Sequence, residues 1–165
     1  MNKIKILSDE IINQIAAGEV LDRPSSAVKE LVENSVDANS KKISVFVRDG
    51  GKTEIIVTDD GDGISKKDLE LAVTRHATSK LNEKKIDTLS FLGFRGEALP
   101  SIGSVSEMFI KSNINEDQNG MMIEIISGIK KKIRPVNHRK GTTVSVKKLF
   151  FSTPARLKFL KTDNY

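Results

Sequence analysis

The chain has 165 residues, 38% of them hydrophobic, which is enough for one domain with a buried core. A net charge of +5, from 27 Lys and Arg against 22 Asp and Glu, is compatible with a phosphate-bearing partner without indicating one. There is no cysteine, which excludes disulfides and cysteine-ligated zinc, and no run approaches the roughly 18 apolar residues that span a bilayer.

The first 60 residues predict two helices followed by a hairpin. Ser8 can cap a first helix that Gly18 should end, with an apolar stripe of Ile11, Ile12, Ile15 and Ala16. Pro24 opens a second helix, which should reach about Ala38. Alternating segments around two glycines then predict a hairpin over residues 43 to 58, and the turn cluster DDGDG follows it.

The remaining chain predicts two further helices and a set of strands. Ser65 and Asp68 have capping-box spacing before a third helix, residues 77 to 96 are mostly irregular, and Pro100 should keep the next helix short. Four strand-like runs follow: SEMFIKS, MMIEIIS, IKKKIRPV and TTVSVKKLF. This order predicts an α+β fold with helices on one face of a mixed, mainly antiparallel sheet. Because residues 156 to 165 begin like a helix and stop without a cap, we expect the sequence to belong to a longer protein.

The second helix carries polar residues with a spacing that suits chemistry. Its buried stripe contains Val28, Leu31, Val32, Ser35 and Val36, while Glu30 and Asn34 lie one turn apart on another face. A carboxylate can orient and deprotonate a water, and an amide oxygen is a ligand that magnesium accepts beside phosphate oxygens. The same residues also fit the solvated face of an ordinary amphipathic helix.

The cluster TDDGDGI follows a strand and fits a tight turn better than a calcium loop. With Gly63 at the glycine position of an EF-hand loop, Thr58 and Leu69 would stand where acids are required. Asp59, held by the sheet, can accept a hydrogen bond from an exocyclic amine such as that of adenine. Gly61 and Gly63 would let the backbone approach a flat ring, although a plain turn explains the cluster too.

Several later motifs could meet phosphate. LGFRGEAL places glycines and an arginine before a helix, and RHATSK is a basic, hydroxyl-bearing loop, but neither a P-loop nor a G-x-G-x-x-G motif is present. The run KKKIRPVNHRK fits a lysine-guarded strand edge, or alternatively a DNA-phosphate patch. His76 and His138 have no acids at ligand spacing, so we do not expect a zinc site.

Five of these segments, in this order, resemble the N-terminal ATPase region of the MutL family of DNA mismatch-repair proteins. They are QIAAGEVLDRPSSAVKELVENSVDAN, DDGDGI, RHATSK, LGFRGEAL and FFSTPARLKFL, and the resemblance extends over residues 4 to 162. It implies the layered α/β sandwich of the GHKL (Bergerat) superfamily, with ATP held between helices and a mobile lid.

The resemblance also implies roles for individual residues. Glu30 becomes the general base for ATP hydrolysis, Asn34 the magnesium ligand, and Asp59 the group that reads adenine, with Gly63 beside the ring. The adenine end would be supported by either Thr142 or Thr143. The phosphates would be wrapped by Thr78, Ser79, Lys80, Gly93, Phe94, Arg95, Gly96 and Glu97.

Two small departures from the family pattern do not touch these atoms. Asn39 replaces a common glycine, and Asn tolerates positive φ. Pro100 replaces a more usual alanine after the lid motif, where it could stiffen the first turn of a helix.

For the whole protein the resemblance implies an ATP-gated dimeric clamp that links mismatch recognition to downstream repair. Its expected partners are DNA, a MutS-type mismatch-recognition protein and a second copy in the ATP-bound state, and no membrane. We expect a soluble intracellular protein, cytoplasmic in a bacterium and nuclear for a eukaryotic paralogue. A second domain beyond Tyr165 would supply a lysine toward the γ-phosphate, so residues 1 to 165 alone should hydrolyse ATP weakly. The rivals are another GHKL enzyme, such as a topoisomerase ATPase or histidine kinase, and a binding module without ATPase chemistry.

Overall fold

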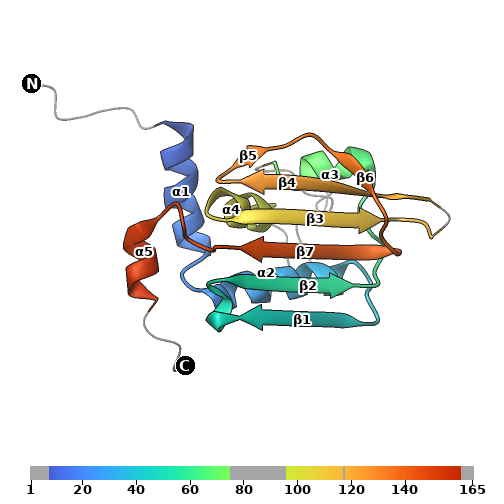
Figure 1. Ribbon diagram of the computed structural model, residues 1–165, viewed down its shortest axis with the longest axis horizontal. Coiled ribbons are helices and arrows are strands. Elements are labelled where there is room, and N and C mark those ends of the chain that lie inside the picture. The colour runs from blue at the N-terminus through green and yellow to red at the C-terminus, as the bar shows by residue number, and fades with distance from the viewer. Residues whose placement is uncertain (1–7, 75–95, 117, 161–165) are drawn as a thin grey trace, which may run out of the picture.

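The structure is a computed structural model that describes residues 8–74, 96–116 and 118–160. Its described strands form one seven-stranded sheet in the order β1-β2-β7-β3-β4-β5, with β6 also paired to β4 (Figure 1). Every pairing in this part of the chain is antiparallel. The strands are β1 (Ile43–Arg48), β2 (Glu54–Asp59), β3 (Glu107–Asn113), β4 (Gly120–Ile126), β5 (Ile129–Lys130), β6 (Arg134–Val136) and β7 (Gly141–Lys147).

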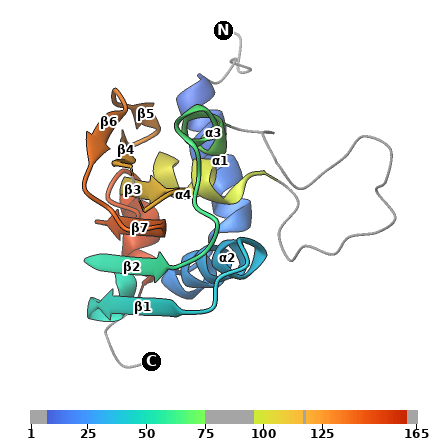
Figure 2. The same ribbon diagram turned by 90° about the vertical axis from the view of Figure 1, so that its right-hand side faces the viewer.

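Helices cover one face of this sheet (Figure 2). They are α1 (Asp9–Val20), α2 (Pro24–Asp37), α3 (Lys66–Ala72) and α4 (Ala98–Ser104), while α5 (Pro154–Phe159) follows the last strand and a short 3-10 helix, η1 (Asp49–Gly51), joins β1 to β2. The predicted fold class is therefore confirmed. One predicted run, IKKKIRPV, divides into β5 and β6 rather than forming a single strand.

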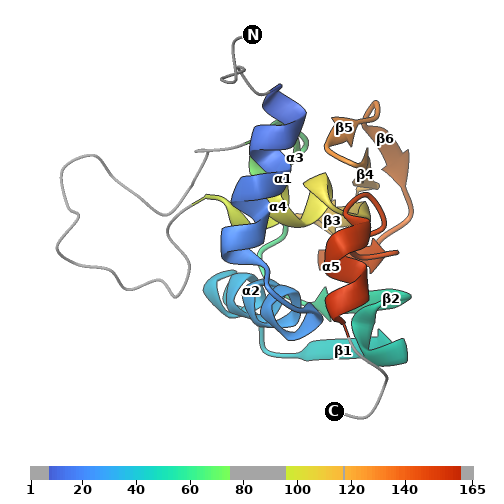
Figure 3. The same cartoon turned by 90° about the vertical axis from the view of Figure 1, so that its left-hand side faces the viewer.

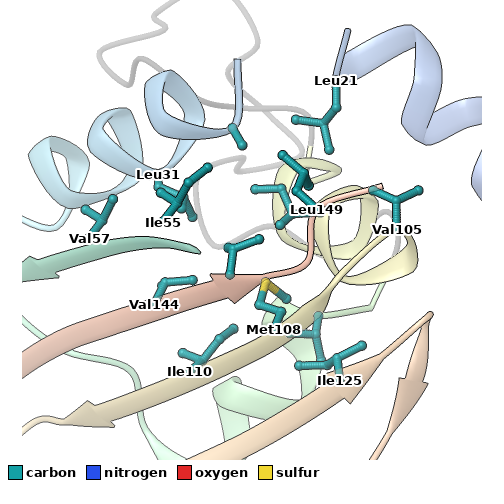
Figure 4. Close-up of a cluster of buried hydrophobic side chains, with 14 of the residues drawn as sticks. Leu21, Leu31, Ile55, Val57, Val105, Met108, Ile110, Ile125, Val144 and Leu149 are labelled. Atoms are coloured by element: carbon teal, nitrogen blue, oxygen red, sulfur yellow. The ribbon is translucent and has the colours of Figure 1, made fainter. Parts of the chain in front are cut away.

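The core lies between the helices and the sheet, and the alternation of each strand decides which residues enter it. In β2 every second residue is buried, so Ile55 and Val57 face the helices while Ile56 faces the open side. Strands β3, β4 and β7 contribute Met108, Ile110, Ile123, Ile125, Val144 and Val146, and α2 contributes Ala27 and Leu31 (Figure 4). Each fully buried Leu or Ile side chain stabilises the fold by about 1.5–3 kcal/mol.

The helix ends follow local sequence, with one exception. The Ser8 hydroxyl accepts from the N–H of Ile11, and the Ser65 hydroxyl accepts from that of Asp68, as capping predicts. Asn39, just after α2, has φ +59, which the substitution for glycine predicts. Pro100 occupies the first turn of α4, where its missing N–H needs no helical partner.

The exception is Gly18, which does not end α1, because the helix continues to Val20. A Cβ built at Gly18 would lie 1.3 Å from Nη2 of Arg156, so the guanidinium occupies the space that a side chain would need. Nη1 of Arg156 donates to the carbonyl of Leu21 at 3.0 Å, which anchors α5 beside the end of α1 (Figures 1 and 3). The glycine therefore serves contact between helices rather than helix termination.

Candidate functional site

Helix α2 presents the two residues singled out for chemistry. Pro24 starts the helix, and its buried stripe of Ala27, Leu31 and Ser35 turns toward the sheet. Glu30 and Asn34 lie beside this stripe and are only half-buried, so both can meet a ligand from solvent. The helix therefore offers a carboxylate and an amide one turn apart at the edge of the covered face.

Asp59 ends β2 beneath this helix and is held by three donors. Its side chain is buried, with 8% of its surface exposed. Oδ1 accepts from the backbone N–H groups of Gly61 at 3.0 Å and Thr142 at 3.1 Å, and Oδ2 accepts from the hydroxyl of Ser35 at 2.8 Å. These contacts fix the plane of the carboxylate.

The turn after Asp59 is packed between the end of α2 and the end of β3. The N–H of Asp62 donates to the carbonyl oxygen of Ala38 at 2.9 Å. A Cβ built at Gly61 would lie 2.5 Å from the same oxygen. Gly63 has φ +75, and a Cβ there would lie 2.1 Å from the carbonyl oxygen of Asn113. Packing against the protein's own backbone therefore already explains why both positions are glycine.

The two candidate threonines of β7 point to opposite faces of the sheet. Thr142 is in register with Asp59 and is buried on the helix-covered face, where its hydroxyl pairs with that of Ser112 at 2.8 Å. The hydroxyl of Thr143 contacts Thr58 at 3.1 Å and Nε2 of His138 at 2.9 Å. Of the two threonines, only Thr142 has its side chain on the same face of the sheet as Asp59, because neighbouring side chains in a strand point to opposite faces.

Two serines in this cluster were not among the predicted site residues. The sequence pattern places Ser35 in the apolar stripe of the second helix, and a serine in such a stripe is itself a signal, because a buried hydroxyl needs a partner. Ser112 accepts from the N–H of Ile64 at 2.7 Å and so ties the turn after Asp59 to β3. No local pattern marks Ser112, since its partners come from distant parts of the chain.

The predicted phosphate-binding residues are only partly described. Gly96, with φ +61, and Glu97 lie at the start of α4, and the Glu97 carbonyl accepts from the N–H of Ser101 at 2.9 Å. The remaining ones lie outside the described residues, as does His76; they are Thr78, Ser79, Lys80, Gly93, Phe94 and Arg95.

Neither a cluster of metal ligands nor a membrane-spanning helix is present in the described residues. No three His, Cys, Asp or Glu side chains gather there as a metal site. A magnesium ion bound through the amide of Asn34 and phosphate oxygens would need no such group. No helix in the described segments is long and apolar enough to cross a membrane.

Comparison with known proteins defines the class. The family model described as "Histidine kinase-, DNA gyrase B-, and HSP90-like ATPase" matches residues 22–147, a stretch that includes α2, Asp59 and Thr142. The chain belongs to this family of ATPases, the GHKL superfamily.

The more specific resemblance to MutL is confirmed by individual relatives. The chain is 53% identical over 160 residues to the DNA mismatch repair protein MutL of Rickettsia bellii, which covers 97% of this chain and 26% of the relative. It is 50% identical to MutL of Afipia carboxidovorans over the same shares of both chains. The chain thus spans about a quarter of the length of the curated relatives it matches.

Solved structures agree. The Aquifex aeolicus MutL ATPase domain complexed with ADP superposes with a TM-score of 0.69 at 36% identity, over 88% of this chain and 50% of that one. The N-terminal domain of a DNA repair protein gives a TM-score of 0.75 at 33% identity, over 90% of this chain and 42% of that one.

Proposed function

We propose that this chain binds ATP together with Mg²⁺ and forms part of the ATPase of a MutL-type DNA mismatch-repair protein. The observation that carries the proposal is the placement of Asp59 and Thr142 side by side beneath the helix that presents Glu30 and Asn34. A relative of the same fold was solved with ADP, which supports a nucleotide as the ligand.

The adenine lies at the Asp59 end in this proposal. The fixed carboxylate accepts a hydrogen bond from the exocyclic amine, which guanine and hypoxanthine do not offer at that position. Thr142 supports the ring through its hydroxyl, and Thr143 has no part because it faces the other side of the sheet. Gly63 follows Asp59 in the turn and lies beside the ring.

The phosphates extend along α2 toward its first half. Asn34 precedes Ser35, the residue that contacts Asp59, and Glu30 lies one turn further on, about 6 Å along the helix axis. The Asn34 amide oxygen would hold Mg²⁺, which neutralises phosphate charge when bound. Glu30 orients and deprotonates the attacking water. Thr78, Ser79, Lys80 and the segment from Gly93 to Glu97 surround the phosphates.

The activity of the whole protein is also part of the proposal. It acts as an ATP-gated dimeric clamp on DNA, in the cytoplasm of a bacterium, with a MutS-type mismatch-recognition protein as partner. The matched ATPase domain is about twice as long as the aligned part of this chain. We therefore propose that residues 1 to 165 bind nucleotide but hydrolyse it weakly, because a following domain supplies a lysine toward the γ-phosphate.

A titration with a non-hydrolysable ATP analogue, with and without Mg²⁺, tests the proposal. Wild-type protein should bind in a magnesium-dependent manner, and Asn34→Ala should lose most of that dependence while keeping its fold by circular dichroism. If binding did not depend on magnesium and Asn34→Ala left it unchanged, the proposal that the nucleotide binds along α2 would be wrong.

A hydrolysis assay, made beside a nucleotide titration, separates an enzyme from a binding module. In a protein that includes the following domain, Glu30→Ala should keep nucleotide affinity and abolish hydrolysis. Equal, residual hydrolysis in wild type and Glu30→Ala would favour the module.

A further inference from the structure

Ser35 lies where α2 meets the adenine carboxylate, although its position in the helix belongs to the apolar stripe. Its side chain is 3% exposed and points into the core beside Leu31. The hydroxyl oxygen is 2.8 Å from Oδ2 of Asp59 and 3.2 Å from the carbonyl oxygen of Leu31. A hydroxyl has one proton, and the shorter contact to a carboxylate is the stronger of the two.

The two oxygens of Asp59 are used differently. Oδ1 already accepts from two backbone N–H groups, those of Gly61 and Thr142. Oδ2 accepts from the Ser35 hydroxyl, which leaves acceptor capacity for a donor from a ligand. An exocyclic amine that reaches Asp59 would therefore meet the oxygen that Ser35 contacts.

The same hydrogen bond joins two parts of the site. It connects α2, which carries Glu30 and Asn34, to the end of β2 across a separation of 24 residues. Because the helix is rigid over one turn, this contact also fixes the position of Asn34 relative to Asp59.

From this geometry we propose that Ser35 is a positioning residue that sets the preference of the site for a purine bearing an exocyclic amine. The proposal rests on the nucleotide function proposed above and refines it. Ser35 acts through Asp59: it holds Oδ2 where this oxygen accepts from the amine, whereas a base with a carbonyl at that position has no donor to gain from the arrangement.

Base selectivity provides the test, because a merely structural serine would not move it. Dissociation constants of non-hydrolysable ATP and inosine triphosphate analogues are measured with the intact protein for wild type, Ser35→Ala and Ser25→Ala. Ser25 lies on the same helix but is exposed, which makes it the matched control. Ser35→Ala should weaken the adenine analogue about tenfold, as the loss of a buried hydrogen bond to a charged group predicts, and should leave the inosine analogue within about twofold.

The outcomes separate the two proposals. Equal weakening of both analogues by Ser35→Ala, or no weakening of either, would overturn the positioning role and leave the nucleotide site intact. Failure of the wild type to prefer the adenine analogue would overturn the proposed reading of adenine by Asp59, and the role of Ser35 with it. Ser35→Thr keeps the hydroxyl and should restore the selectivity of the wild type; a selectivity as low as that of Ser35→Ala would contradict the role.

Discussion

Two neighbouring rows of side chains on the helix-covered face of the sheet are built from opposite chemistry. Here, "apolar row" denotes Val57, Val144, Ile110 and Ile123, and "polar row" denotes Asp59, Thr142 and Ser112; in both, members are register partners across adjacent strands. Both rows are buried, and they are only two residues apart along each strand.

The contrast is between apolar packing and directed hydrogen bonding within one layer. The apolar row stabilises the fold by removing apolar surface from water, which requires only side chains of suitable shape and volume. The polar row is satisfied by hydrogen bonds among its own members, Ser35 and backbone N–H groups, and each of these groups must point correctly. The molecule thus places its directional contacts at the strand ends that meet the proposed ligand.

Truncation of the apolar row should have the largest effect on folding. Ile110→Ala removes a fully buried side chain at the centre of the sheet and should lower the free energy of unfolding by about 2–5 kcal/mol. Nucleotide affinity, measured where the variant is still folded, should stay within about threefold. Urea denaturation checks the first part and analogue titration the second. A hundredfold loss of affinity in fully folded Ile110→Ala would mean that the apolar row also determines nucleotide binding, contrary to the distinction between the rows.

In the polar row, Asp59→Asn should show the reverse pattern. The amide keeps Oδ1 for its two backbone donors, and its Nδ2 can donate to the Ser35 hydroxyl, which then donates to Leu31. The free energy of unfolding should therefore fall by only about 1 kcal/mol. An adenine amine would now meet another donor, so affinity for the ATP analogue should fall about a hundredfold. Calorimetric melting and analogue titration are made on the same samples. A large drop in melting temperature would show that affinity falls because the fold is lost, and not because the amine meets a donor.

The two threonines of β7 form a matched pair for a smaller effect. Thr142→Val removes a hydroxyl from the polar row and should weaken analogue binding about fivefold to tenfold, through the loss of one hydrogen-bonding group. Thr143→Val removes a hydroxyl that contacts Thr58 and His138 on the other face, so binding should not change. If Thr143→Val proved the more damaging, the assignment of the nucleotide to the helix-covered face would be wrong.

Local features of this chain could be predicted from the sequence, and long-range ones could not. The period of residues 28 to 36 is enough to predict α2, and the tolerance of Asn for positive φ is enough to predict the conformation of Asn39. The incorrect prediction that Gly18 ends α1 fails because the reason for the glycine, Arg156, lies far along the chain. The choice of Thr142 over Thr143 likewise depends on its register with Asp59, which only the folded sheet supplies.

The smallest effect concerns the turn that leads out of the polar row. Hydrogen bonds from the backbone N–H groups of Lys42 and Lys41 to Oδ1 of Asp60, at 2.8 and 2.7 Å, hold the pKa of this exposed carboxyl below its usual value of 3.8. Because the folded pKa is the lower one, the stabilisation is complete well above pH 3.8 and is lost as the pH falls through the folded pKa. Asp60→Asn should therefore lower the denaturation midpoint slightly at neutral pH, leave it unchanged below the folded pKa, and so remove this part of its pH dependence. Lys42→Ala keeps the backbone N–H that donates to Asp60 and should retain most of this pH dependence; its loss in Lys42→Ala would mean that the lysine charge, rather than the backbone, stabilises the carboxylate.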